Sequence, residues 1–266
     1  MGSLDGDDDV TAVADKILQA FESTPYDRRL LVAIAGPPGS GKSTLAYPLT
    51  DLLNSRLLQR PPPAPLAADN DTSTGIVSPP VLEGDEIAIC VGLDGWHYSR
   101  AELDRFPDPV EAHWRRGAAF TFNLPSYLAF LTSLRLPLSP NPPKGIPFPT
   151  FNHARKDPAP SANPILPRHR IVLVEGLYTL LDRPGWRDTA DMYDIRVFVD
   201  CAREVCRERV IRRNFAAGIV ESLDKCAERV DAVDMVNGEE VRNHLFNPTH
   251  IVRPADEPER HRPESS

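Results

Sequence analysis

The chain has 266 residues, of which 41% are hydrophobic and 26% are charged. This length and balance favour one large α/β domain with a full core and exclude a wholly disordered chain. The formal net charge is -8, and Lys and Arg form no continuous basic block, so we expect no nucleic acid as a partner.

The N-terminal sequence and the cysteines bear on the cellular location. Residues 1–9 are acidic where a leader peptide would be basic, and no apolar run reaches the ~18 residues of a membrane span. We therefore expect a cytoplasmic protein without a membrane partner. The four cysteines form no CxxC pair, which predicts reduced, structural thiols at Cys90, Cys201, Cys206 and Cys226.

The first predicted element is a helix that follows the acidic tail. Apolar residues recur there at helical spacing, at Val10, Val13, Ile17 and Phe21. Pro25 ends this helix. We therefore assign residues 1–24 to an acidic tail with an N-terminal helix, and residues 25–254 to the main domain.

The main domain begins with an apolar strand at residues 30–34, followed by a glycine-rich motif. A helix comes next, with its apolar face marked by Leu45, Leu49, Leu52, Leu53 and Leu57. Residues 59–80 are rich in proline and poor in apolar side chains, which predicts a flexible insertion. A buried strand at 86–93 then ends at Asp94.

The middle of the chain alternates helical and proline-rich segments. Helices are predicted at 101–106, 109–116 and 125–134. A second proline-rich stretch, 137–149, leads into residues 151–156, which we place on a loop or an edge hairpin.

The last third returns to strands and helices. Short apolar strands at 171–174 and 195–199 end at Glu175 and Asp200. They precede a basic helix at 203–217, an acidic helical run at 221–235, a strand at 249–252 and a disordered tail at 255–266. The alternation predicts an α/β fold with a doubly wound, mostly parallel sheet, whose ligands gather at the carboxyl ends of the strands.

The glycine-rich motif matches the pattern of a phosphate-binding P-loop. Its glycines let backbone N–H groups turn toward phosphates, Lys42 reaches the β and γ phosphates, and the Ser43 hydroxyl ligates magnesium. The motif lies between a predicted strand and a predicted helix, so we expect a P-loop NTPase fold with ATP and Mg2+ as cofactors. The predicted nucleotide-binding residues are Gly36, Pro37, Pro38, Gly39, Ser40, Gly41, Lys42, Ser43 and Thr44.

Two carboxylates at strand ends are candidates for chemistry. Asp94 could accept the proton of an acceptor hydroxyl, or could simply open a turn with Gly95. Glu175 could hold magnesium through water, or could be a carboxylate at the start of a helix.

Three arginines share one helical neighbourhood. Arg209, Arg212 and Arg213 are spaced so that they can converge on one anionic target as part of a helical lid. The alternative is a solvated face on which Glu204 and Glu208 neutralise them.

Polar and aromatic residues near these motifs are candidates for the acceptor pocket. His97, His153 and Arg155 could contact the acceptor, or could be exposed or structural residues. Trp96, Tyr98 and Phe151 are candidates for pocket walls.

In order along the chain, these motifs resemble those of the uridine kinase, phosphoribulokinase and bacterial-type pantothenate kinase group, over roughly residues 30–254. The phosphate loop is followed by Asp94-Gly95-Trp96-His97-Tyr98, similar to the Asp-[Ser/Gly]-Phe motif, and by Pro149-Thr150-Phe151-Asn152-His153, which resembles the Pro-x-Tyr segment. Glu175-Gly176 and Arg209-Val210-Ile211-Arg212 complete the series.

The resemblance implies a role for each motif. Asp94 would be the catalytic base, acting with Lys42, and Glu175 would be a carboxylate of the magnesium site. Arg209 and Arg212 would be the lid arginines, and the loops around Phe151 would form the acceptor pocket.

Three positions depart from the group's pattern. Trp96 replaces Phe, Phe151 replaces Tyr, and Arg213 stands where uridine kinases carry Asp, which argues against uridine itself. The segments 101–104, 108–112 and 115–118 look closer to a less characterised subgroup of fungal and bacterial kinase-like proteins.

The leading hypothesis is an ATP-dependent kinase that phosphorylates a hydroxyl of a nucleoside, a sugar or a pantothenate-like acceptor. A homodimer is one assembly that we consider. The alternative is an accessory ATPase or nucleotide switch that regulates a partner. The sequence has no Asn-Lys-x-Asp motif of the kind GTPases use to bind the base.

Overall fold

The computed structural model describes residues 4–61, 84–152, 154–216 and 222–254. The predicted insertion lies outside these ranges from residue 62 onward, as do the predicted tail at 255–266 and His153. Within the described part of the chain, no helix combines the length and the apolar character that a membrane span requires.

The centre of the fold is a five-stranded sheet in which every pairing is parallel, in the order β2-β5-β1-β6-β7. Its strands are β1 (Leu30–Ala35), β2 (Ala88–Gly92), β5 (Ile171–Glu175), β6 (Ile195–Val199) and β7 (His250–Val252). All six residues of β1 are buried, as expected for a central strand that is covered on both faces. The predicted doubly wound α/β fold is confirmed.

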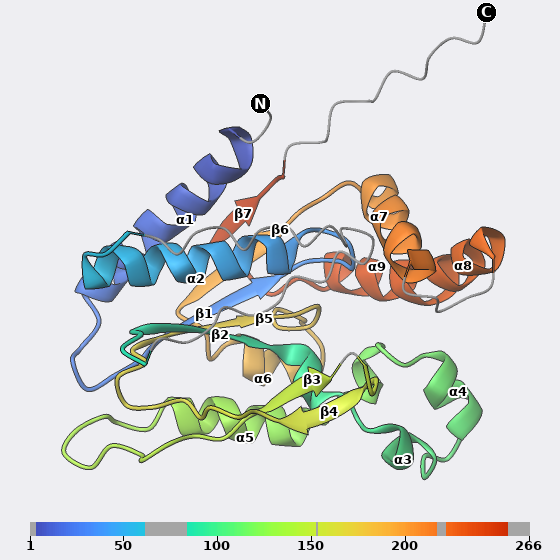
Figure 1. Cartoon of the computed structure of the whole chain (residues 1–266). Helices are drawn as coiled ribbons and strands as arrows, with labels where there is room; N and C mark the ends of the chain where they lie inside the picture. Colours follow the sequence, from blue (N-terminus) through green and yellow to red (C-terminus); the bar gives the residue numbers. More distant parts are fainter. Residues whose placement is uncertain (1–3, 62–83, 153, 217–221, 255–266) are drawn as a thin grey trace, which may run out of the picture.

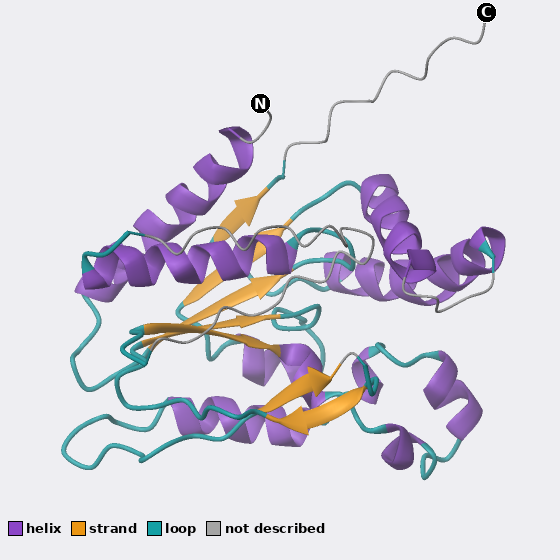
Figure 2. Ribbon diagram, viewed as in Figure 1, coloured by secondary structure: helices purple, strands orange, loops and turns teal. Residues whose placement is uncertain are grey.

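Helices cover both faces of the sheet (Figures 1 and 2). The longer helices are α1 (Leu4–Glu22), α2 (Lys42–Leu58), α5 (Leu124–Leu134), α7 (Arg203–Ala216) and α9 (Met235–Asn243). The shorter ones are α3 (Arg100–Leu103), α4 (Pro109–Trp114), α6 (Trp186–Ala190) and α8 (Leu223–Arg229). Alternate strand residues form two cores, one beneath α1 and α2 and the other beneath α5 and α6.

Helix α1 belongs to the main core. It begins at Leu4, so most of the acidic segment is helical rather than a tail. Val13, Ala14 and Ile17 are buried in the same cluster as the residues of α2 and the sheet. Helix α1, α2 and the sheet therefore share one core.

The segment after β2 is held against a separate two-stranded hairpin. A short 3-10 helix, η1 (Leu93–Trp96), follows β2, and β3 (Pro149–Asn152) pairs antiparallel with β4 (Asp157–Pro160). A Cβ atom at Gly95 would lie only 2.1 Å from the carbonyl oxygen of Pro149, so only glycine allows this approach. Of the predicted loop or edge hairpin at 151–156, Phe151 and Asn152 lie in β3 of a hairpin that is separate from the main sheet.

The C-terminal helices form an arm beside the P-loop end of the sheet (Figure 1). The acidic run predicted to be helical at 221–235 contains α8 and a π-helical turn, η3 (Val230–Asp234), and the helix continues as α9 to Asn243. Helices α7 to α9 share a small core that contains Cys201, Cys206 and Cys226. These three thiols and Cys90 are free, as predicted.

The burial of Ile17, which is 0% exposed, predicts that α1 stabilises the domain. Ile17→Ala should lower the free energy of unfolding by about 2–5 kcal/mol, because it leaves a cavity in the core. The exposed Gln19→Ala on the same helix is the control and should change it by less than about 0.5 kcal/mol. Urea unfolding measures both. Equal, small effects would show that α1 is peripheral.

Candidate active site

The P-loop connects β1 to α2 and leaves the N-terminus of that helix open. Gly39 and Gly41 have φ angles of 79° and 94°, which favour glycine. Gly41 caps α2 without any side-chain hydrogen bond, and the first turn contains no acidic residue. The free N–H groups and the positive end of the helix dipole make this a site for an anion.

The loop is packed too tightly for larger residues. A Cβ atom at Gly36 would lie 2.7 Å from the carbonyl oxygen of Val199, and one at Gly39 would lie 2.5 Å from that of Cys206. The hydroxyl of Ser40 is buried and has no hydrogen-bond partner among the described residues. A buried, unpaired hydroxyl in a loop of this shape fits contact with a phosphate oxygen.

Lys42 begins α2, and its side chain returns to the loop. Its Nζ donates to the carbonyl oxygen of Pro37 at 3.0 Å. Burial lowers the pKa of Lys42. The carboxylates of Glu175 and Asp94 act to raise this pKa, and the charge of Arg213 acts to lower it further. The four side chains therefore lie within electrostatic range of one another.

Glu175 ends β5 beside the P-loop. The parallel register aligns it with Gly92 of β2 on one side and with Ile34 of β1 on the other. Burial raises the pKa of Glu175 to about 7, with Lys42 lowering it and Asp94 raising it further. Glu175 is thus only partly ionised at neutral pH, and a bound cation would favour its charged form.

Two oxygen donors meet at this point, since Ser43 Oγ donates to Glu175 Oε2 at 3.4 Å. Within the described residues there is no cluster of three or more His, Cys, Asp or Glu side chains that could hold a metal ion. Magnesium in nucleotide sites usually takes only one or two protein oxygens, together with phosphates and water. Ser43 and Glu175 fit that donor set.

Asp94 lies in η1, two residues after β2. Its backbone carbonyl accepts a hydrogen bond from His97 N at 3.2 Å and one from His97 Nδ1 at 2.8 Å. Its carboxylate stays 56% exposed, although it is close enough to raise the pKa of Glu175. The backbone therefore forms the turn, which leaves the carboxylate available at the strand edge.

His97 and Phe151 lie side by side next to Asp94. The centre of the His97 ring lies 4.0 Å from the centre of the Phe122 ring and 5.3 Å from that of the Phe151 ring. Burial lowers the pKa of His97, so the ring is neutral at pH 7. The ring of Tyr98 instead packs against Phe106, at 5.2 Å.

Trp96 is not a wall of an open pocket. Its side chain is 2% exposed and lies in the core. The centre of its ring is 5.1 Å from the ring centre of Tyr127 and 4.8 Å from that of Phe130. The prediction was wrong because the tight turn of η1 directs Trp96 toward α5, where a large aromatic side chain fills the core.

The arginines of α7 divide between two faces. Arg209 Nη1 donates to the carbonyl oxygen of Gly39 at 3.5 Å, so Arg209 reaches the P-loop. Arg212 is 70% exposed and pairs with Glu208. This matches the alternative of a solvated face rather than a clamp on an anion. The helix buries Val210, and a residue two positions further on must face away from it.

Arg213 follows Arg212 in the sequence but lies on the face of α7 that is near the P-loop. Its side chain is exposed, yet its charge adds to the lowering of the Lys42 pKa by burial and opposes the raising of the Asp234 pKa by burial. The predicted trio therefore does not converge, and Arg209 and Arg213 are the two that lie near the P-loop. The apolar residues Cys206 and Val210, four positions apart, mark the buried face of α7 and are the sequence signal that distinguishes Arg212 from Arg213.

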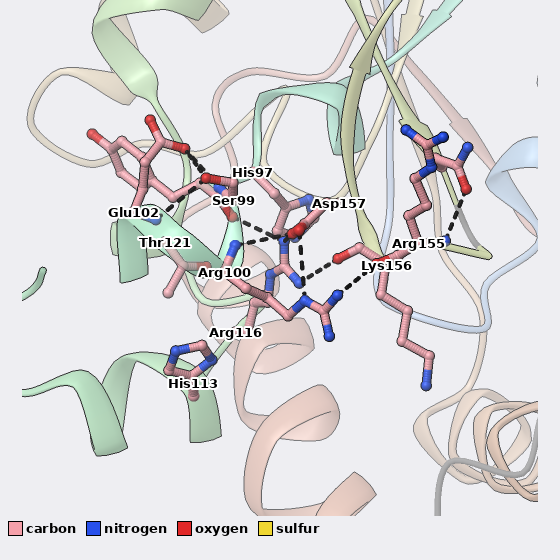
Figure 3. Close-up of polar contacts among 12 residues, drawn as sticks. His97, Ser99, Arg100, Glu102, His113, Arg116, Thr121, Arg155, Lys156 and Asp157 are labelled. Carbon is pink, nitrogen blue, oxygen red and sulfur yellow. Dashed lines mark hydrogen bonds and ion pairs between the residues drawn. The ribbon is translucent and has the colours of Figure 1, made fainter. Parts of the chain in front are cut away.

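A polar cluster beside the hairpin contains residues that the sequence motifs did not single out as site residues (Figure 3). Arg116 donates to Asp157 Oδ1 at 2.8 Å, and its guanidinium carbon lies 5.6 Å from the ring centre of Phe151. Arg100 is 3.5 Å from Asp157 Oδ2. Arg155, a predicted acceptor residue, lies at the same turn.

The model of the Phosphoribulokinase / Uridine kinase family matches residues 97–240. The chain is also 31% identical to a Schizosaccharomyces pombe protein named "Putative uridine kinase C227.14", over 92% of each chain. The chain belongs to the phosphoribulokinase / uridine kinase family. The family and the matched relatives are kinases, so the protein is an ATP-dependent kinase.

Two fungal proteins add to this comparison. An Aspergillus versicolor ATP-dependent kinase-like protein, notR', is 37% identical over 58% of this chain and 89% of its own. The crystal structure of YFH7 from Saccharomyces cerevisiae, described as a P-loop kinase with a circular permutation, superposes with a TM-score of 0.75 at 25% identity. That superposition covers 93% of this chain and 99% of YFH7.

The division of the arginines predicts unequal effects on ATP binding. Arg213→Gln should weaken binding of a non-hydrolysable ATP analogue by roughly 10-fold, the usual loss when a charged hydrogen-bond donor is removed. Arg212→Gln, with its exposed ion pair, should change binding by less than about 3-fold. Titration calorimetry gives both values. A larger loss in the Arg212 variant would contradict the orientation of α7.

Proposed function

We propose that this protein is a magnesium- and ATP-dependent kinase that transfers the γ-phosphate of ATP to a hydroxyl group of a small metabolite. The observation that carries the proposal is the exposed carboxylate of Asp94 on the same sheet edge as Lys42 and Glu175. A nucleotide-binding loop alone requires no such carboxylate.

Each residue has a task that its position allows. The open N-terminus of α2 and Lys42 bind the phosphates, and Arg209 and Arg213 add positive charge from the helical arm. Ser43 and Glu175 would hold magnesium, which supplies charge neutralisation on the phosphates. Asp94 orients the acceptor hydroxyl and takes its proton.

The surroundings of Asp94 support a small-molecule acceptor. The aromatic pair of His97 and Phe151 offers an apolar wall, and the neutral imidazole adds no charge beside the carboxylate. Arg155 and Lys156 lie at the turn between β3, which contains Phe151, and β4. An accessory ATPase would need only the nucleotide half of this arrangement.

The role of Asp94 is tested by Asp94→Asn. ADP release in the presence of magnesium ATP and a pool of hydroxylated metabolites should fall by about 10²–10⁴-fold, because the general base is lost. Binding of a non-hydrolysable ATP analogue should remain. Asp104→Asn, an exposed carboxylate that pairs with His113, is the matched control and should retain activity.

Two outcomes would contradict this role. Acceptor-stimulated ADP release at the wild-type rate in Asp94→Asn would remove Asp94 from the chemistry. Absence of any stimulation in the wild-type protein would contradict the kinase proposal itself.

A further inference from the structure

A hollow of about 630 Å3 lies between the start of α3 and the turn of the β3–β4 hairpin. Ser99 and Arg100 line one side of it, and residues 154–158 line the other. It is wide enough for the polar end of a small metabolite. Neither the nucleotide-binding loop nor the magnesium donors contribute to its walls.

The hollow is basic in a chain whose net charge is -8. Arg100, Arg155 and Lys156 line it together with the carboxylate Asp157, and Arg116 lies against Asp157 (Figure 3). Asp157 is already shared by Arg100 and Arg116, at 3.5 and 2.8 Å. Glu102 lies nearby, but its carboxylate accepts hydrogen bonds from the backbone N–H and the hydroxyl of Ser99.

Two of these cations have no anionic partner among the described residues. In the structure as described, neither Arg155 nor Lys156 has a side-chain hydrogen bond or ion pair. Their side chains extend away from Asp157 on the far side of the turn (Figure 3). The backbone carbonyls of the same two residues accept hydrogen bonds from Arg100 and Arg116, which hold the turn in place.

A short series of contacts links the hollow to Asp94 at the end of β2. His97 contacts the carbonyl of Asp94 at 2.8 Å, and its ring lies 5.3 Å from that of Phe151. The guanidinium of Arg116 covers Phe151 and reaches Asp157. His97, Phe151 and Arg116 therefore form a continuous line of contacts from Asp94 to Asp157, which lines the hollow.

We propose that this hollow binds the anionic group of the acceptor, so that the substrate is a hydroxylated carboxylic acid or a sugar phosphate rather than a neutral nucleoside or sugar. The inference rests on the proposed kinase function. Carboxylates and phosphates share the oxygens that Arg and Lys bind best, and Arg155 and Lys156 supply the charge that Asp157 does not neutralise.

The reaction itself is the same for either anion. The acceptor hydroxyl oxygen forms a bond to the γ-phosphorus of ATP as the bond between that phosphorus and the β–γ bridging oxygen breaks. The hydroxyl proton passes to the Asp94 carboxylate, and ADP leaves with the bonding electron pair. The anionic group held in the hollow takes no part in this step and serves to position the hydroxyl.

The experiment divides the acceptor pool by charge. ADP release from magnesium ATP is measured with three defined pools: hydroxy acids and sugar acids, sugar phosphates, and neutral nucleosides, sugars and polyols. Stimulation by the first or the second pool is expected, and which one responds identifies a carboxylate or a phosphate as the bound group. The responding pool is then resolved into single compounds.

The double variant Arg155→Gln/Lys156→Gln tests the hollow directly. Because these side chains contribute no described hydrogen bond or ion pair, the fold should be retained. KM for the stimulating acceptor should rise by roughly 10-fold or more, with kcat and KM for ATP changing by less than about 3-fold. The matched control Lys144→Gln/Arg168→Gln removes two exposed cations from loops away from the hollow and should change neither constant.

The outcomes separate the two proposals. Stimulation by the neutral pool alone would overturn the anionic acceptor and leave the kinase function standing. An unchanged KM in the Arg155/Lys156 variant would likewise overturn the role of the hollow. No stimulation by any pool would contradict the kinase function, and the inference would fail with it.

Discussion

The parallel pairing of β5 with β1 on one side and β2 on the other determines the geometry of the whole site. This register aligns Glu175 with Ile34 and Gly92, so the ends of three strands meet at one edge. The P-loop follows β1, Asp94 follows β2, and Glu175 ends β5. The residues proposed to bind the nucleotide, the metal and the acceptor are therefore brought together by hydrogen bonding in the sheet, over more than 130 residues of sequence separation.

The same edge holds two buried ionisable side chains, Lys42 and Glu175, whose charged forms are disfavoured by burial. Burial raises the pKa of Glu175 and lowers that of Lys42, although the charge of each favours the charged form of the other. Groups held in this way are poised for ligands, because a triphosphate and a divalent cation would favour the charged forms that burial disfavours. The tight packing of Gly39 against Cys206 holds the loop in the required shape.

The sheet and the nucleotide site could be predicted because they depend on local sequence. Apolar runs that end in a carboxylate, and glycines before Lys42, carry that information in adjacent residues. The position of Trp96 depends on α5, and the faces of Arg212 and Arg213 depend on what α7 packs against, so neither follows from spacing alone. The basic hollow is assembled from distant segments, and no motif revealed it.

In the proposed reaction the γ-phosphate goes to a hydroxyl group rather than to water. Phosphorus NMR of the products formed from magnesium ATP and the acceptor pools distinguishes the two. ADP should appear together with a new phosphate ester resonance in equal amount. Inorganic phosphate as the sole partner of ADP would rule out transfer to a hydroxyl group and would identify the protein as an ATPase.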